Sequence, residues 1–129
     1  MRMDTVEASI LVVDDEADYL ATYRRLFARQ GFRVVTAASR AAALEALGRE
    51  RFAVVVADLR LPDGDGLDIV RIARTSTDPP PAVVVSGFAS SHVRKAARDA
   101  GASAFFAKPF EAAALTARVG ELIAGRSGA

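Results

Sequence analysis

The stretch "SILVVDDEAD" (residues 9–18) places four consecutive apolar, strand-forming residues directly before two aspartates and a glutamate. The apolar run predicts a strand that is buried on both faces. A buried strand gains nothing from ending in carboxylates, because taking a charge out of water costs free energy unless the charge has a partner. The acidic residues therefore predict that a positive group belongs at the carboxyl end of this strand.

Four further apolar runs resemble the first one, and helical stretches separate them. Each run is rich in β-branched or aromatic residues and shows little alternation, as expected of strands covered on both faces. The five predicted strands are residues 9–13, 32–37, 52–57, 82–86 and 102–107. Five strands alternating with five helices predict an α/β fold, a doubly wound parallel sheet with right-handed crossovers and helices on both faces. The fourth helical stretch offers only Val93 and three alanines as apolar anchors, so we expect it to be held weakly.

The composition limits the classes of function. The 129 residues carry 17 basic and 16 acidic side chains, a formal net charge of +1. This balance lacks the cationic surplus of non-specific nucleic-acid binding, so we expect no direct contact with nucleic acid. The absence of cysteine excludes disulfides and thiolate metal sites. Residues 1–9 lack the apolar core of a signal peptide and no run is long enough to span a membrane, which predicts a cytoplasmic protein without a membrane partner.

Polar side chains stand at the carboxyl ends of four predicted strands. Asp14 and Asp15 follow the first strand, Asp58 the third, Ser86 ends the fourth, and Lys108 follows the last. Ligands of such folds bind beyond these strand ends, so we expect the five side chains to meet at one rim. Clustered carboxylates repel one another unless a cation neutralises them, and hard oxygen ligands suit Mg²⁺. A carboxylate beside Mg²⁺ can attack a phosphoryl group, whose oxygens an ammonium and a hydroxyl can stabilise.

Four motifs contain these residues: "LVVDDE", "VVADLRLPDGDGLDIV", "VVVSG" and "GASAFFAKPF". These motifs, in this order, resemble those of response-regulator receiver domains of two-component systems, and the likeness extends over about residues 8–124. The resemblance implies a flavodoxin-like (βα)5 fold with strand order 2-1-3-4-5 and a receiver domain over residues 9–124. We expect residues 1–8 to be a flexible N-terminus and residues 125–129 a disordered tail or the start of a linker.

Carried over position by position, the resemblance implies a role for each polar residue of the rim. Asp58 is the expected phosphoacceptor, which takes a phosphoryl group from a sensor histidine kinase or phosphotransfer protein. The expected protein ligands of Mg²⁺, which Mn²⁺ can replace, are Asp14, Asp15, Asp58 and the backbone carbonyl of Arg60, with Asp14 acting largely through water. Lys108 is expected to pair with the acyl phosphate.

The resemblance also implies a conformational switch. Ser86 is expected to move toward the phosphoryl group, and Phe105, where the family often has a tyrosine, to swing inward by packing alone. Gly87 leaves the phosphate entrance open, and the Lys108–Pro109 bond is expected to be cis. The fourth helix, fifth strand and fifth helix would then meet a downstream effector or output domain. The chain would modify itself, with at most slow autodephosphorylation, and would not be an enzyme acting on an external metabolite.

Departures from the family pattern predict two further properties. Arg60 and Phe88 occupy positions that in this family influence how fast water reaches the acyl phosphate, and a long cation and a ring there predict a long phosphoryl lifetime. Receivers attached to winged-helix DNA-binding domains often form a charged dimer interface. This chain has Ser103, Ala104 and Ala114 where that interface needs acidic residues, which disfavours a dimer of that type.

Two other functional classes stay open at this stage. A phosphorylation-independent pseudo-receiver would keep the fold as an interaction module, but the complete set of rim residues argues against it. Aspartate-dependent phosphohydrolases also place a nucleophile after the first strand. They require a second aspartate two residues later, where this chain has Glu16, and capping insertions that a chain of this length does not supply.

Overall fold

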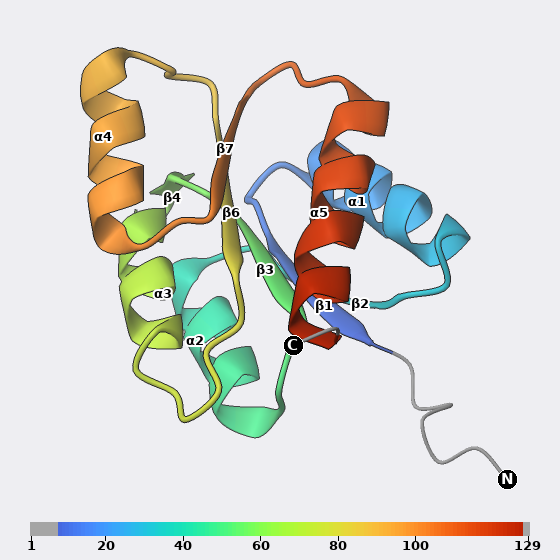
Figure 1. The fold of residues 1–129 in the computed structure, drawn as a ribbon. Helices are drawn as coiled ribbons and strands as arrows, with labels where there is room; N and C mark the ends of the chain where they lie inside the picture. The colour runs from blue at the N-terminus through green and yellow to red at the C-terminus, as the bar shows by residue number, and fades with distance from the viewer. Residues whose placement is uncertain (1–7, 128–129) are drawn as a thin grey trace, which may run out of the picture.

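The computed structural model describes residues 8–127 and has a parallel sheet at its centre (Figure 1). The five strands lie in the order β2-β1-β3-β6-β7, and each neighbouring pair is parallel. The strands are β1 (Ser9–Val13), β2 (Arg33–Ala37), β3 (Val54–Asp58), β6 (Ala82–Ser86) and β7 (Ala104–Ala107). The predicted α/β fold and the strand order 2-1-3-4-5 are confirmed.

Five helices cover the two faces of the sheet. They are α1 (Ala17–Arg29), α2 (Arg40–Arg49), α3 (Gly66–Ala73), α4 (Ser91–Ala100) and α5 (Ala112–Ser127). Helices α1 and α5 lie on one face, and α2, α3 and α4 lie on the other (Figure 1). Among residues 8–127, no helix combines the length and the apolar character that crossing a membrane requires.

Strand β1 shows why the apolar runs do not alternate with polar residues. Ile10 and Val12 pack into the core beneath α1 and α5, whereas Leu11 and Val13 pack into the core beneath α2 and α3. Successive side chains of a strand point to opposite faces, and both faces of this sheet are covered. All four side chains are fully buried, so a polar residue within the strand would lose its hydration, and the first carboxylate comes only where the strand ends.

Helix α4 begins and ends at the residues that the sequence indicates. The Ser90 hydroxyl accepts a hydrogen bond from the Val93 N–H at 3.2 Å, and Gly101 ends the helix in the left-handed region, with φ 108°. The buried side chains of the helix are two alanines, Ala97 and Ala100. Small side chains bury little apolar area, which agrees with the expectation that this helix is held weakly.

A short hairpin between β3 and α3 was not expected. Strand β4 (Arg60–Leu61) pairs antiparallel with strand β5 (Gly64–Asp65), and the Asp65 carboxylate caps α3 by accepting from the Leu67 N–H at 2.8 Å. Helix α3 starts so close to β3 that a Cβ atom at Gly66 would collide with the backbone carbonyl of Asp58. Glycine at this position therefore lets the hairpin fold back beside the last residue of β3.

The C-terminal end differs from the expected disordered tail over residues 125–129. Helix α5 continues through Ser127. Its last turn is held because the Arg126 guanidinium donates to the carbonyl oxygens of Phe52 and Ala53 and pairs with the Asp78 carboxylate at 2.7 Å. Residues 128–129, and residues 1–7 of the expected flexible N-terminus, lie outside the described residues.

Candidate functional site

The polar residues of the rim meet at the carboxyl edge of the sheet, above four neighbouring strands. Strand β1 leads into Asp14 and Asp15, β3 and β6 end with Asp58 and Ser86, and β7 leads into Lys108. Backbone hydrogen bonds continue beyond the strands: the Lys108 N–H donates to the Ser86 carbonyl at 2.8 Å. The parallel register therefore brings residues far apart in the chain to one place.

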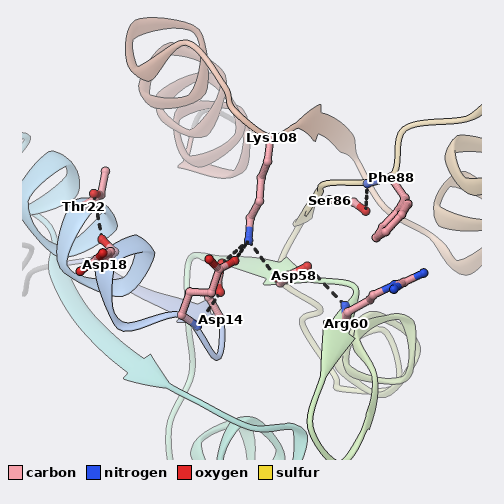
Figure 2. Close-up of polar contacts among 9 residues, drawn as sticks. Asp14, Asp18, Thr22, Asp58, Arg60, Ser86, Phe88 and Lys108 are labelled. Carbon is pink, nitrogen blue, oxygen red and sulfur yellow. Dashed lines mark hydrogen bonds and ion pairs between the residues drawn. The ribbon is translucent and has the colours of Figure 1, made fainter.

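The Lys108 ammonium is the positive group beside the carboxylates of this edge. Its Nζ lies 2.8 Å from Asp14 Oδ2, 2.9 Å from Asp58 Oδ2 and 3.3 Å from Glu16 Oε1. Figure 2 shows the lysine side chain reaching from the end of β7 to the two aspartates. With only 9% of its side chain exposed, Lys108 supplies part of the positive charge that the acidic residues after β1 predict.

Asp14 and Lys108 respond to burial in different ways. Asp14 is completely buried, and this burial raises its pKa above the ordinary value although Lys108 and the Glu16 N–H donate hydrogen bonds to it. Burial by itself would lower the pKa of Lys108, but its hydrogen bonds to Asp14 and Asp58 outweigh that effect and hold the pKa above the ordinary value. Lys108 therefore remains a cation, and it offsets a carboxylate that is costly to ionise.

A pocket of about 200 Å³ opens beside Asp58. Asp58 is nearly buried, and its Oδ1 accepts a hydrogen bond from the Arg60 N–H at 3.3 Å. The buried Ser86 hydroxyl accepts from the Phe88 N–H at 3.0 Å, which leaves its own proton available to donate. The lining residues are Asp15, Glu16, Asp58, Arg60, Ser86, Gly87, Phe88 and Lys108.

Arg60 and Phe88 lie at this pocket and contact each other. The Arg60 guanidinium carbon lies 3.8 Å from the centre of the Phe88 ring, a cation–π arrangement. Phe88 is 53% exposed, so the pair stands between the pocket and the solvent. In Figure 2 both side chains lie beside Asp58, on the side away from Asp14.

The acidic residues offer the ligands that a hard divalent cation needs. Asp14, Asp15, Glu16 and Asp58 each present a carboxylate oxygen, and these oxygens lie within 4.8 Å of one another. Oxygen donors at such spacing fit Mg²⁺, Mn²⁺ or Ca²⁺. This donor set contains the three aspartates named from the sequence and adds Glu16.

Two residues of the site were missed in the reasoning from sequence. Glu16 pairs with Lys108, and the Tyr19 ring centre lies 4.0 Å from the same ammonium. The position of Glu16 directly after two aspartates is a signal for the first. The sequence carries no comparable signal for Tyr19, because its contact with Lys108 joins segments that lie far apart in the chain.

The remaining expected residues surround this centre. The Lys108–Pro109 peptide bond is cis, in agreement with the expectation. Phe105 lies half-buried on β7, where the Arg94 guanidinium carbon stands 4.7 Å from its ring centre. The Arg94 side chain also donates to the carbonyl of Ala89, in the loop before α4, at 3.1 Å. Phe105 therefore contacts α4 through a cation as well as through packing.

Comparison with known proteins places these features in one family. The family model of the response regulator receiver domain matches residues 10–120. The transcriptional regulatory protein PrrA of Mycobacterium tuberculosis is 38% identical over 126 residues, which are 96% of this chain and 54% of that protein. The chain thus spans about half the length of the curated relatives it matches.

Solved structures agree with this match. A CheY-like receiver domain protein from Methanospirillum hungatei superposes with a TM-score of 0.89 at 25% identity, covering 95% of this chain and 98% of that one. A response regulator from Burkholderia pseudomallei, solved with a phosphorylated aspartic acid, a calcium ion and citrate, superposes with a TM-score of 0.80 at 27% identity, covering 93% and 73%. The chain belongs to the response regulator receiver domains of two-component signalling, with the CheY-like α/β fold.

Proposed function

We propose that the chain is a phosphorylation-controlled switch in which Asp58 accepts a phosphoryl group from the phosphohistidine of a sensor histidine kinase or phosphotransfer protein. The observation that carries this proposal is the position of Asp58, which lines an open pocket between the Lys108 ammonium and the Ser86 hydroxyl. A related structure contains a phosphorylated aspartic acid. The proposed site is cytoplasmic and contacts neither nucleic acid nor membrane directly.

The proposed metal ligands are Asp14, Asp15, Asp58 and the backbone carbonyl of Arg60, with Asp14 acting largely through water. Their support is the set of carboxylate oxygens within 4.8 Å of one another. A bound Mg²⁺, or Mn²⁺ in its place, would screen the repulsion between the Asp58 carboxylate and the incoming phosphoryl group. Glu16 stands near enough to add negative charge to this site.

In the proposed transfer, an Asp58 carboxylate oxygen forms a bond to phosphorus while the bond from phosphorus to the histidine nitrogen of the donor breaks. Lys108 exchanges its ion pair with Asp58 for one with a phosphoryl oxygen. The Ser86 hydroxyl, which accepts from the Phe88 N–H before transfer, donates a hydrogen bond to a second phosphoryl oxygen. The chain modifies itself in this step and has no external metabolite as substrate.

The proposed output follows from the added charge. Phosphorylation adds nearly two negative charges, which draw Ser86 and Lys108 toward the phosphoryl group and displace the loop before α4. Helix α4 can follow because its buried side chains are alanines, and Phe105 repacks against it. The shift between two existing states changes the surface of α4, β7 and α5, which meets a downstream effector or output domain.

Intact-mass measurement after incubation with acetyl phosphate tests this proposal. We expect a gain of one phosphoryl group in the presence of Mg²⁺, and no gain when EDTA removes the metal. A folded protein that gains no mass with Mg²⁺ would contradict the proposal and favour a phosphorylation-independent pseudo-receiver. Circular dichroism of the same samples shows whether the protein is folded.

The contact between Arg60 and Phe88 predicts a slow loss of the phosphoryl group. A Phe88→Ala variant loses the ring and its cation–π contact with the Arg60 guanidinium, so water reaches the pocket more easily. We expect the phosphoryl half-life to shorten by about two- to fivefold, the range that corresponds to an exposed cation–π contact. Decay is followed by intact mass after the donor is removed. Ile72→Ala, which truncates another exposed apolar side chain, serves as control, and an unchanged half-life in Phe88→Ala would refute the shielding role.

A further inference from the structure

The Lys108 ammonium has an uncharged neighbour in addition to its carboxylates. Its Nζ lies 4.0 Å from the centre of the Tyr19 ring, over the ring face, where the π electrons attract a cation. Tyr19 belongs to the first turn of α1, which begins directly after the acidic residues of the rim. The ammonium therefore stands between a group of carboxylates and one aromatic face.

The Tyr19 ring is held in place by other aromatic side chains. Its centre lies 6.1 Å from the Tyr23 ring and 5.9 Å from the Phe110 ring. Tyr23 and Phe110 stack on each other at 5.7 Å with their planes 11° apart, and Tyr23, which is fully buried, also stacks on Phe27. Such aromatic contacts restrict the ring. Tyr19 is thus fixed from α1 on one side and from the segment after β7 on the other.

A fixed aromatic ring beside Lys108 can hold the ammonium near the site while the ammonium exchanges one anionic partner for another. A lysine side chain is long and flexible, and carboxylates at 2.8 and 2.9 Å hold its charge firmly. Phosphoryl transfer requires the ammonium to leave Asp58 and bind a phosphoryl oxygen. An aromatic face attracts the cation without adding negative charge, so it limits how far the ammonium can move while leaving its protons free for either partner.

We infer that Tyr19 is a positioning residue that acts through Lys108. Its ring face holds the ammonium in place by a cation–π contact while the ammonium exchanges Asp58 for the phosphoryl group as its partner. This inference rests on the proposed function. Tyr19 is not among the residues that line the pocket beside Asp58, so we do not class it as a catalytic residue. The attraction comes from the ring and not from the hydroxyl, so phenylalanine should replace tyrosine here and leucine, which is apolar but has no π face, should not.

The contact between the Lys108 ammonium and the Tyr19 ring can be tested without phosphorylation. Lys95 and Lys108 are the lysines of the chain, so lysine labelled with ¹³C and ¹⁵N gives two sets of side-chain signals, and the exposed Lys95 serves as internal reference. Ring current from Tyr19 is expected to shift the Lys108 ε-methylene protons upfield of those of Lys95. The shift is expected to persist in Tyr19→Phe and to disappear in Tyr19→Leu. A Lys108 signal that is the same in Tyr19→Leu and in the wild type would overturn the inference.

The consequence for transfer is measured as the rate of phosphorylation by acetyl phosphate and Mg²⁺. Tyr19→Leu is expected to react about three- to tenfold more slowly than the wild type, a loss between those of an exposed and of a fully desolvated cation–π contact, because Tyr19 is only partly buried. Tyr19→Phe is expected to react at nearly the wild-type rate. Equal rates in Tyr19→Leu and wild type, or equal losses in both variants, would overturn the positioning role. Absence of phosphorylation in the wild type would instead refute the proposed function. The chemical shifts of the Lys108 side chain would still show whether the Tyr19 ring holds the ammonium.

Discussion

An Asp58→Asn variant is expected to gain no phosphoryl group from acetyl phosphate and Mg²⁺ under conditions in which the wild type is modified. Asparagine has nearly the shape of aspartate, and its carbonyl oxygen can still accept the Arg60 N–H that Asp58 Oδ1 accepts at 3.3 Å. It lacks the charged oxygen that would attack phosphorus, and it removes one carboxylate from the proposed metal site. The fold should persist while the chemistry is lost.

Intact mass measured over time distinguishes loss of the acceptor from loss of structure. Asp18→Asn is the matched control, because Asp18 is an exposed aspartate of α1 close in sequence to the site. The control is expected to be phosphorylated like the wild type. Phosphorylation of Asp58→Asn at the wild-type level would place the acceptor elsewhere and would contradict the assignment of Asp58.

A Lys108→Met variant is expected to lower the free energy of unfolding by about 3 kcal/mol at neutral pH without divalent metal. Methionine keeps the length and the apolar part of the side chain but removes the charge. The carboxylates of Asp14 and Asp58 would then lie close together at a nearly buried position without their shared ammonium. Removing one partner of a buried ion pair destabilises the folded state strongly, because the remaining charge is buried without compensation.

The loss of stability in Lys108→Met should depend on pH, because it depends on whether the Asp14 carboxyl is ionised. Burial already raises the pKa of this carboxyl in the folded state, and removing Lys108 would raise it further. A carboxyl whose pKa is higher in the folded state than in the unfolded state adds to the free energy of unfolding. This contribution is complete at a pH below the unfolded-state pKa and is lost as the pH rises through the folded-state pKa. The difference between wild type and variant should therefore shrink in acid and grow toward neutral pH.

Urea unfolding measured by circular dichroism tests both expectations. Lys95→Met removes a lysine whose ion pair with Asp99 is exposed, so it is expected to leave the free energy of unfolding nearly unchanged. Mg²⁺ should restore much of the stability of Lys108→Met, because a ligand that binds only the folded state stabilises it. A variant as stable as the wild type without metal at neutral pH would show that the ammonium does not balance these carboxylates.

The general form of the site could be predicted because it depends on strand ends. Apolar runs that do not alternate indicate strands covered on both faces, and β1 confirms this with side chains packed into both cores. In a parallel sheet the carboxyl ends lie at one edge, so Asp14, Asp58 and Lys108 had to come close. The individual roles and the strand order came from the family resemblance, since periodicity does not specify them.

The features that could not be predicted depend on side-chain direction and on contacts between distant segments. Tyr19 was not singled out from the sequence, and only the packed structure brings its ring face to Lys108. The last turn of α5 looked disordered in the sequence "AGRSGA" because the anchor of Arg126 lies at Phe52 and Ala53, far away in the chain. The hairpin after β3 consists of two strands of two residues each, which are too short to show a periodic pattern in the sequence.

Chemical trapping of the phosphorylated residue shows which carboxylate carries the phosphoryl group. Borohydride reduces an aspartyl acyl phosphate to homoserine, and peptide mass spectrometry then identifies the converted position. After incubation with acetyl phosphate and Mg²⁺, we expect homoserine at position 58, with aspartate retained at Asp14 and Asp15, and no conversion after EDTA treatment. Conversion at Asp14 or Asp15, or conversion that does not depend on the metal, would show that Asp58 is not the metal-dependent phosphoacceptor.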